Sequence, residues 1–172
     1  MRLDLGPLDK LASEKPFEVE GSFDPMQVGG ETVEFEGPVT VRGKVERVRS
    51  GARLRGQVTA PVRLRCGRCL DRYPTVLSPE VEVLLRGPNA ELAEDDSIPY
   101  APQVDLAPAV EEAIVLELPV RPLCRPDCQG LCPRCGARRE DGCSCEGEPD
   151  PRWSALGEWV RAHGEGGGRP DR

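Results

Sequence analysis

The sequence predicts an α+β protein: a curved antiparallel sheet or small barrel with one packed central helix, a cysteine-rich module and a short C-terminal helix. Three observations support this prediction. Apolar and polar residues alternate along residues 32–86, apolar residues recur at helical spacing along 105–118, and six of the eight cysteines lie within 124–145. The length of 172 residues suits one compact domain with an appendage.

The period-two segments predict strands with one buried face. They begin at 32–36, where Val33 and Phe35 alternate with glutamates, and continue in 39–48 and 53–65, which we expect to pair as a hairpin. A further pair is expected at 73–77 and 80–86, where Pro79 marks an edge or a bulge. Residues 1–30 show only a possible extended piece at 17–20.

Asp105 is the expected N-cap of the central helix, and Pro119 ends it. Its apolar stripe should pack against the sheet. The preceding residues, 87–104, read as a polar loop. We expect four parts in the chain: a β-rich domain at 1–123 with the helix 105–118, a cysteine-rich module at 124–147, a C-terminal helix at 148–163 and a disordered tail at 164–172.

The cysteines have the spacing of zinc ligands. Two pairs, Cys66 with Cys69 and Cys132 with Cys135, are separated by two residues, as in the tight turns that present two thiolates to one ion. Eight ligands suggest two zinc ions with four cysteines each, and the module should close onto the 66–69 turn. The candidate ligands are Cys66, Cys69, Cys124, Cys128, Cys132, Cys135, Cys143 and Cys145.

The simplest division gives one zinc the last four cysteines and joins Cys124 and Cys128 to Cys66 and Cys69. Other divisions stay open, because Cys128 and Cys132 have the same spacing as Cys124 and Cys128. Disulfides are the less favoured alternative, since the N-terminal residues show no secretory signal. We therefore expect a reduced, cytoplasmic location, and no stretch reaches the length of a membrane helix.

Charge is distributed unevenly along the chain, which has a net charge of -7. Residues 37–72 contain ten basic and two acidic residues, whereas 91–117 contain eight acidic and no basic ones. The predicted hairpin would gather basic side chains on its outer face, beside the first cysteine pair. The candidate nucleic-acid contacts are Arg42, Lys44, Arg53, Arg55, Arg63, Arg65, Arg68 and Arg72. The alternative is two solvated faces that balance each other.

The cysteine turns and the segments between them resemble the sequences of the YceD family, the large ribosomal RNA subunit accumulation proteins. The matching segments are CGRCL at 66–70, VDLAPAVEEAIVLELPVRPLC at 104–124, CQGLCPRCG at 128–136, CSC at 143–145 and DPRW at 150–153. The resemblance implies a bacterial cytoplasmic factor without known catalysis that acts in processing of large-subunit (23S) ribosomal RNA or in early ribosome assembly. It also supports the pairing of Cys66 and Cys69 with Cys124 and Cys128.

We therefore expect a non-enzymatic protein whose basic sheet face contacts large-subunit ribosomal RNA. The alternative partner is a basic large-subunit ribosomal protein, bound through the acidic segment 91–117. An enzyme is disfavoured, because four thiolates fill the coordination sphere of a zinc ion and no nucleotide-binding glycine loop is present. We expect neither a membrane nor a small-molecule substrate as partner.

Overall fold

The computed structural model describes residues 1–49, 51–87, 97–145 and 151–163. The chain divides into two compact units, Met1–Gly130 and Leu131–Arg172. The first unit includes Cys124 and Cys128, whose sulfurs lie close to those of Cys66 and Cys69. No helix in these ranges is long and apolar enough to cross a membrane.

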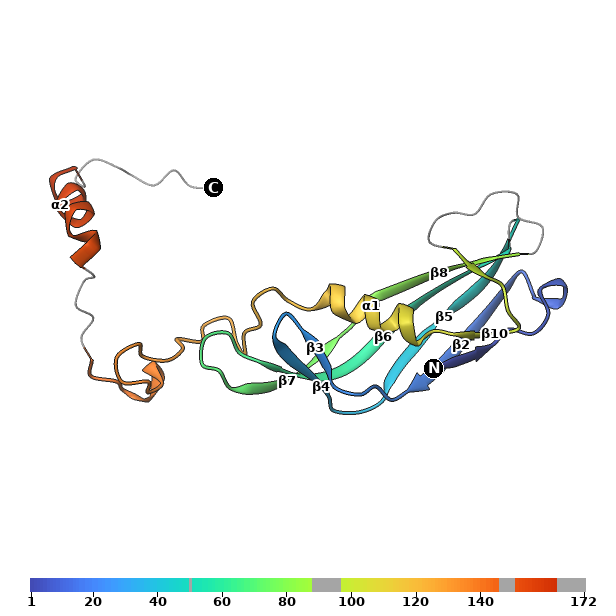
Figure 1. The fold of residues 1–172 in the computed structure, drawn as a ribbon, viewed down its shortest axis with the longest axis horizontal. Helices are drawn as coiled ribbons and strands as arrows, with labels where there is room; N and C mark the ends of the chain where they lie inside the picture. The colour runs from blue at the N-terminus through green and yellow to red at the C-terminus, as the bar shows by residue number, and fades with distance from the viewer. Residues whose placement is uncertain (50, 88–96, 146–150, 164–172) are drawn as a thin grey trace. The chain divides into compact units, whose positions relative to one another are not determined.

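The central strand of the first unit is β6 (Gly51–Arg65), which forms the expected hairpin with β5 (Val39–Val48). The first half of β6 also pairs with β8 (Glu80–Arg86), and its second half pairs with β4 (Glu31–Phe35) and β7 (Arg72–Leu77). Figure 1 shows β6 running between these neighbours. The flanking strands are β2 (Glu14–Gly21) beside β5, β3 (Met26–Val28) beside β4 and β9 (Ile98–Pro99) beside β8.

This sheet is open: within the described residues, its path runs from β2 through β5, β6 and β4 to β3 without closing. Of the two predicted forms, the curved sheet is therefore the one observed. Prolines mark where β6 changes partners. The carbonyl of Pro61, within β6, accepts a hydrogen bond from Glu36 N at 2.9 Å, and the carbonyl of Pro79 accepts one from Val58 N at 2.8 Å. Two further prolines, Pro16 in β2 and Pro74 in β7, lie in strands at the rim of the sheet.

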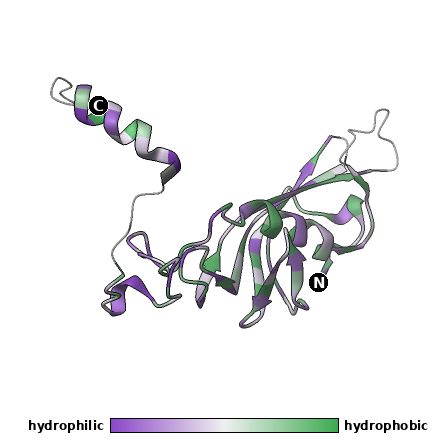
Figure 2. Cartoon of the chain, turned by 60° about the vertical axis from the view of Figure 1, so that its left-hand side comes forward, coloured by the Kyte–Doolittle hydropathy of each residue, from purple (hydrophilic) through white to green (hydrophobic). Residues whose placement is uncertain are grey.

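The core lies between the inner face of the sheet and α1 (Ala107–Glu117). Leu54 and Val58 of β6 are fully buried, as are Val110 and Ile114 of α1. Burial of each such side chain contributes about 1.5–3 kcal/mol. Figure 2 shows hydrophobic and hydrophilic residues interspersed along the strands, as one buried face requires.

Asp105 lies one residue before the N-cap of α1, which is Leu106 and makes no side-chain cap bond. Asp105 still serves the start of the helix, because its Oδ1 accepts a hydrogen bond from Ala107 N at 3.0 Å. This bond, together with the amino group of Met1 at 3.0 Å, lowers the pKa of the Asp105 carboxyl. The Asp105 carboxylate therefore keeps its negative charge beside the positive end of the helix.

Short strands stand where the sequence suggested loop. β1 (Arg2–Asp4) pairs with β10 (Gln103–Asp105), and β2 is longer than the extended piece expected at 17–20. Parts of the predicted loop, 88–96, and the predicted disordered tail, 164–172, lie outside the described residues. The second unit contains the predicted C-terminal helix, α2 (Ser154–His163).

Substitution of Gly43 should test a close approach of β5 and β6. A Cβ at Gly43 would stand 2.0 Å from Arg55 O and 2.6 Å from Gly56 Cα, whereas one at Gly37 would make an ordinary contact, 3.5 Å from Pro61 Cγ. We expect Gly43→Ala to lower the free energy of unfolding by about 1–3 kcal/mol, and Gly37→Ala to leave it nearly unchanged. Urea unfolding measures both, and equal midpoints would contradict the close approach of β5 and β6.

Candidate metal centres

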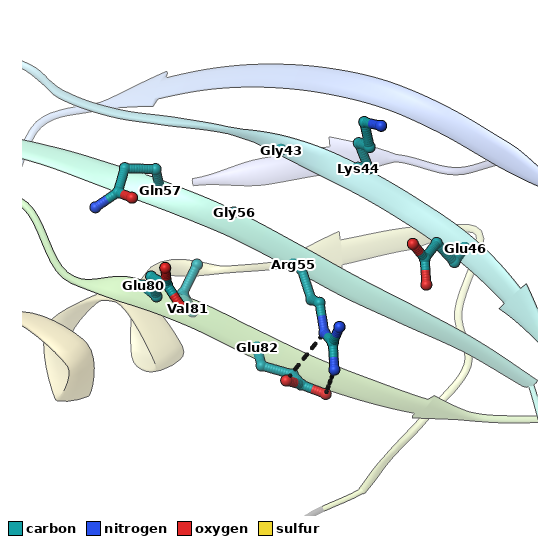
Figure 3. Close-up of a pocket in the computed structure, with 9 residues that line it drawn as sticks. All are labelled: Gly43, Lys44, Glu46, Arg55, Gly56, Gln57, Glu80, Val81 and Glu82. Carbon is teal, nitrogen blue, oxygen red and sulfur yellow. Dashed lines mark hydrogen bonds and ion pairs between the residues drawn. The ribbon is translucent and has the colours of Figure 1, made fainter.

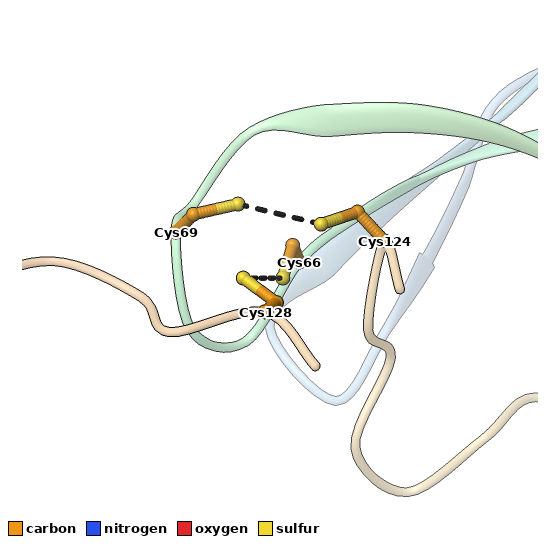
Figure 4. A group of neighbouring side chains, drawn as sticks. All are labelled: Cys66, Cys69, Cys124 and Cys128. Atoms are coloured by element: carbon orange, nitrogen blue, oxygen red, sulfur yellow. Dashed lines mark hydrogen bonds between the residues drawn. The ribbon is translucent and has the colours of Figure 1, made fainter. Parts of the chain in front are cut away.

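The first cysteine quartet joins two distant parts of the Met1–Gly130 unit. Cys66 and Cys69 lie in the turn between β6 and β7, and Cys124 and Cys128 lie in the segment after α1 (Figure 4). All four Sγ atoms lie within 4.8 Å of one another. The Sγ atoms of Cys66 and Cys128 are 3.9 Å apart, and those of Cys69 and Cys124 are 3.7 Å apart.

Hydrogen bonds to backbone carbonyls hold these two parts together beside the sulfurs. Gly67 N donates to Pro122 O at 2.8 Å, and the Arg68 guanidinium donates to Cys128 O at 2.7 Å. Gly130 adopts φ +76°, and a Cβ there would stand 2.9 Å from Arg68 O. Only glycine suits both conditions, so the chain can pass close to the turn at that point.

The two cysteine pairs adopt the same turn, although only the second has a glycine directly after its second cysteine. In each turn the first cysteine donates to the carbonyl five residues ahead, and the residue after the second cysteine donates back to the first. The bonds are Cys66 N to Asp71 O at 2.8 Å, Leu70 N to Cys66 O at 3.0 Å, Cys132 N to Ala137 O at 2.7 Å and Gly136 N to Cys132 O at 2.9 Å. Leu70 has φ 64° and Gly136 has φ 72°. Leu70 is therefore strained.

The second quartet is local to the Leu131–Arg172 unit. Cys132, Cys135, Cys143 and Cys145 bring their Sγ atoms within 4.8 Å of one another. A 3-10 turn at Arg139–Asp141, followed by Gly142 at φ 82°, reverses the chain between the two halves of the quartet. The structure thus forms the two groups of the simplest division, and Cys128 does not pair with Cys132.

The two quartets differ in burial. In the first, Cys66 is 0% and Cys128 is 2% exposed, and Tyr73 and Leu123 pack against them. In the second, Cys132 is buried, whereas Cys135 and Cys145 are exposed. Water therefore reaches the second quartet more freely than the first.

Hydrogen bonds prepare one thiolate in each quartet. Burial opposes ionisation of Cys66, but hydrogen bonds from backbone amides, including that of Arg68 at 3.5 Å, lower its pKa to about 6. Amides of Cys135 and Arg134 likewise lower the pKa of Cys132 to about 6. These amides favour the thiolate form of one sulfur in each quartet, which is the form that binds a metal ion.

The sulfur spacing fits a tetrahedral ion. Four sulfurs placed about 2.3 Å from one zinc ion stand about 3.8 Å apart, close to the 3.7 and 3.9 Å found in the first quartet. Sites of four thiolates select zinc or iron. Both quartets can therefore hold a metal ion without a further ligand.

The predicted basic side chains lie on the outer face of the sheet, but glutamates stand beside them. Arg42 Nη2 is 2.8 Å from Glu18, and Arg53 and Arg55 lie 3.2 and 3.1 Å from Glu82. Figure 3 shows Arg55 and Glu82 joined across the strands. Three further predicted contacts are paired in the same way: Lys44 with Glu14, Arg63 with Glu36, and Arg72 with Glu34.

The two other predicted contact residues, Arg65 and Arg68, donate hydrogen bonds to backbone carbonyls. Arg65 Nε donates to Leu70 O at 3.3 Å, and Arg68 fixes the first quartet as described above. Arg68 therefore stabilises the first quartet, a structural role that a basic residue in the sequence does not indicate.

The register of the strands explains why this face is not a basic patch. It places eight basic side chains, Arg42, Lys44, Arg53, Arg55, Arg63, Arg65, Arg72 and Arg86, on the same face as eight glutamates, Glu14, Glu18, Glu20, Glu34, Glu36, Glu46, Glu80 and Glu82. The charges of these side chains cancel. The sequence-based prediction of a basic face did not include these glutamates. The alternation of Glu80 and Glu82 with Val81 and Val83 could have placed the two glutamates on the outer face.

Metal analysis should find two metal ions per chain. We expect Cys66→Ser to lose one ion and to destabilise the 1–130 unit, because it opens a link between distant segments. Cys143→Ser should also lose one ion but leave the unfolding midpoint of the 1–130 unit unchanged. Native mass spectrometry counts the ions, and hydrogen exchange reports the stability of each unit. Loss of both ions from either variant would contradict two independent centres.

Replacement of Leu70 should show the strain in the first turn. Leu70 is 49% exposed, so Leu70→Gly removes little buried surface while it removes the cost of φ 64°. We expect a gain of about 1 kcal/mol in the free energy of unfolding. Gly136→Leu should destabilise the second turn by a similar amount. Thermal unfolding of the zinc-loaded protein measures both, and a destabilising Leu70→Gly would contradict the strain.

Comparison with known proteins yields relatives that are themselves mostly uncharacterized. The chain is 37% identical over 124 residues to an uncharacterized protein of Mycobacterium tuberculosis (strain H37Rv), with 68% of this chain and 59% of that protein covered. It is 32% identical over 136 residues to one of Mycobacterium leprae, covering 72% and 60%. The chain thus spans about three-fifths of the length of these relatives. No solved structure matches it.

A plant protein with a functional name is more distant. The chloroplastic large ribosomal RNA subunit accumulation protein YCED homolog 1 of Zea mays is 27% identical over 144 residues, covering 65% of this chain and 49% of that protein. The model of the family described as large ribosomal RNA subunit accumulation protein YceD matches residues 54–158. This match runs from β6 through both quartets to α2 and includes more than half of the chain. The chain therefore belongs to the YceD family.

Proposed function

We propose that this protein supports the accumulation of large-subunit ribosomal RNA as a non-enzymatic factor, that both quartets hold zinc, and that the outer sheet face contacts the RNA. The family match over residues 54–158 carries this proposal, because the family is named for that role. The zinc ions would be structural, since four thiolates leave no coordination position for a substrate or for water.

Exposed ion pairs on the outer face can exchange partners. Most of the paired basic residues and glutamates there are more than one third exposed, as Arg55 at 57% and Glu82 at 46% illustrate. Such pairs contribute only about 0–1 kcal/mol each. RNA phosphates can therefore replace the glutamates at low cost, and the guanidinium groups would then bind phosphate in the same geometry.

A hollow in the outer face marks where the proposed RNA contact would lie. It has a volume of about 680 Å³ and is lined by Gly43, Lys44, Glu46, Arg55, Gly56, Gln57, Glu80, Val81 and Glu82 (Figure 3). Because the charges of the face cancel, long-range attraction to nucleic acid would be weak. The contact would therefore depend on local shape and would discriminate against unrelated polyanions.

Removal of Glu82 should strengthen RNA binding. Glu82→Gln frees Arg53 and Arg55 from their shared carboxylate, so we expect tighter binding to large-subunit ribosomal RNA fragments and a steeper dependence on salt. Arg55→Gln should weaken binding. Glu20→Gln is the matched control: it makes the same charge change on the same face, away from the two arginines. Filter binding over a salt series measures all three variants.

Equal effects of Glu82→Gln and Glu20→Gln would show that only net charge matters and would contradict a specific contact at the hollow. The same variants, expressed in cells that lack the native gene, should change the ratio of large- to small-subunit ribosomal RNA in the order of their RNA affinities. An unchanged ratio without the gene would refute the proposed role in accumulation itself.

A further inference from the structure

An apolar groove lies in the 1–130 unit beside the C-terminal end of α1. Its volume is about 270 Å³. The β3–β4 hairpin forms one wall, and the end of α1 with the segment that follows forms the other. The lining residues that the argument uses are Val28, Val33, Leu64, Val115, Leu118 and Val120. Such a volume admits about one or two large apolar side chains.

Apolar side chains continue from the groove onto the solvent side of α1. Leu116 is 78% exposed and Val120 is fully exposed, whereas Val110 and Ile114 on the opposite side of the helix are buried in the core. A helix that packs only through its buried stripe needs polar residues on its other side. Large exposed apolar residues next to an apolar groove mark an interaction surface.

The charges along α1 have one sign, and the groove beside it is lined by Glu31 and by one basic residue, Arg65. Glu111, Glu112 and Glu117 are exposed, and no basic residue occurs between Arg86 and Arg121. Glu117 lies in the last turn, where the helix dipole is negative and where no basic residue compensates it. The negative charge of Glu117 at the negative end of the dipole destabilises the helix, and a cation from a partner would offset this repulsion.

We propose that this groove and the exposed side of α1 dock an amphipathic, basic protein segment. Its apolar side chains enter the groove between the β3–β4 hairpin and Val120 and cover Leu116. Its lysines or arginines face Glu112, Glu117 and the carbonyl end of the helix. The glutamates of α1 would repel a negatively charged RNA backbone, so the proposed segment is a protein and the proposal does not depend on the RNA contact.

The first cysteine quartet holds one wall of the groove. The segment 118–122 runs from α1 toward Cys124, and Pro122 accepts the hydrogen bond from Gly67 at 2.8 Å. Closure of the quartet therefore fixes the distance between this segment and the hairpin.

Short synthetic peptides provide the test. A helical probe with leucine on one face and lysine on the other should bind the full-length, zinc-loaded protein at physiological salt, as measured by fluorescence anisotropy. Two companion probes, one with glutamate for lysine and one with serine for leucine, should not bind. We expect Leu116→Ser with Val120→Ser to weaken binding about tenfold or more, and Glu112→Gln with Glu117→Gln to weaken it as well.

Val76→Ser is the matched control, because Val76 is a 57% exposed apolar residue on β7, outside the groove. It should leave binding of the leucine–lysine probe unchanged. Equal binding of the serine–lysine probe, or equal losses with Val76→Ser, would reduce the effect to general charge attraction and overturn the proposal. Self-association that disappears in the Leu116→Ser, Val120→Ser variant would also overturn it, since a second copy would then be the occupant.

Discussion

Closure of the first cysteine quartet is the constraint on which the other features of the 1–130 unit depend. Cys66 and Cys69 end the central strand, and Cys124 and Cys128 lie more than fifty residues further along the chain. A metal ion that joins them removes the conformational freedom of a long loop. Because this loop includes β7, β8 and α1, one ion would fix the end of the sheet and the exit of the helix together.

The outer face of the sheet shows how strand register alters the meaning of a charged sequence. Residues 37–72 are strongly basic, yet β2, β4 and β8 bring glutamates from other parts of the chain alongside. Cross-strand pairs of opposite charge are mildly favourable, and like charges would repel. The basic segment of the sequence therefore forms part of a nearly neutral surface. Any anionic ligand there must compete with the glutamates for the basic side chains.

The parts of the fold with strong local signals could be predicted from the sequence. Regular alternation gave β5, β6 and β8, helical spacing with Asp105 gave α1, and the cysteine spacing gave the simplest division into quartets. Strands of three residues, such as β1 and β10, have too few positions to show a period. The pairing of Arg42 with Glu18 and the structural use of Arg68 depend on segments that meet only after folding.

The prolines at the rim of the sheet have a consequence for the behaviour of the protein at high concentration. A strand at a sheet margin offers unpaired backbone groups that can recruit another chain into a growing stack. Pro16 in β2 and Pro74 in β7 each delete one donor from such a row. The molecule thus resists fibrillar polymerisation through two residues that take no part in its core, its metal ligands or its charged face.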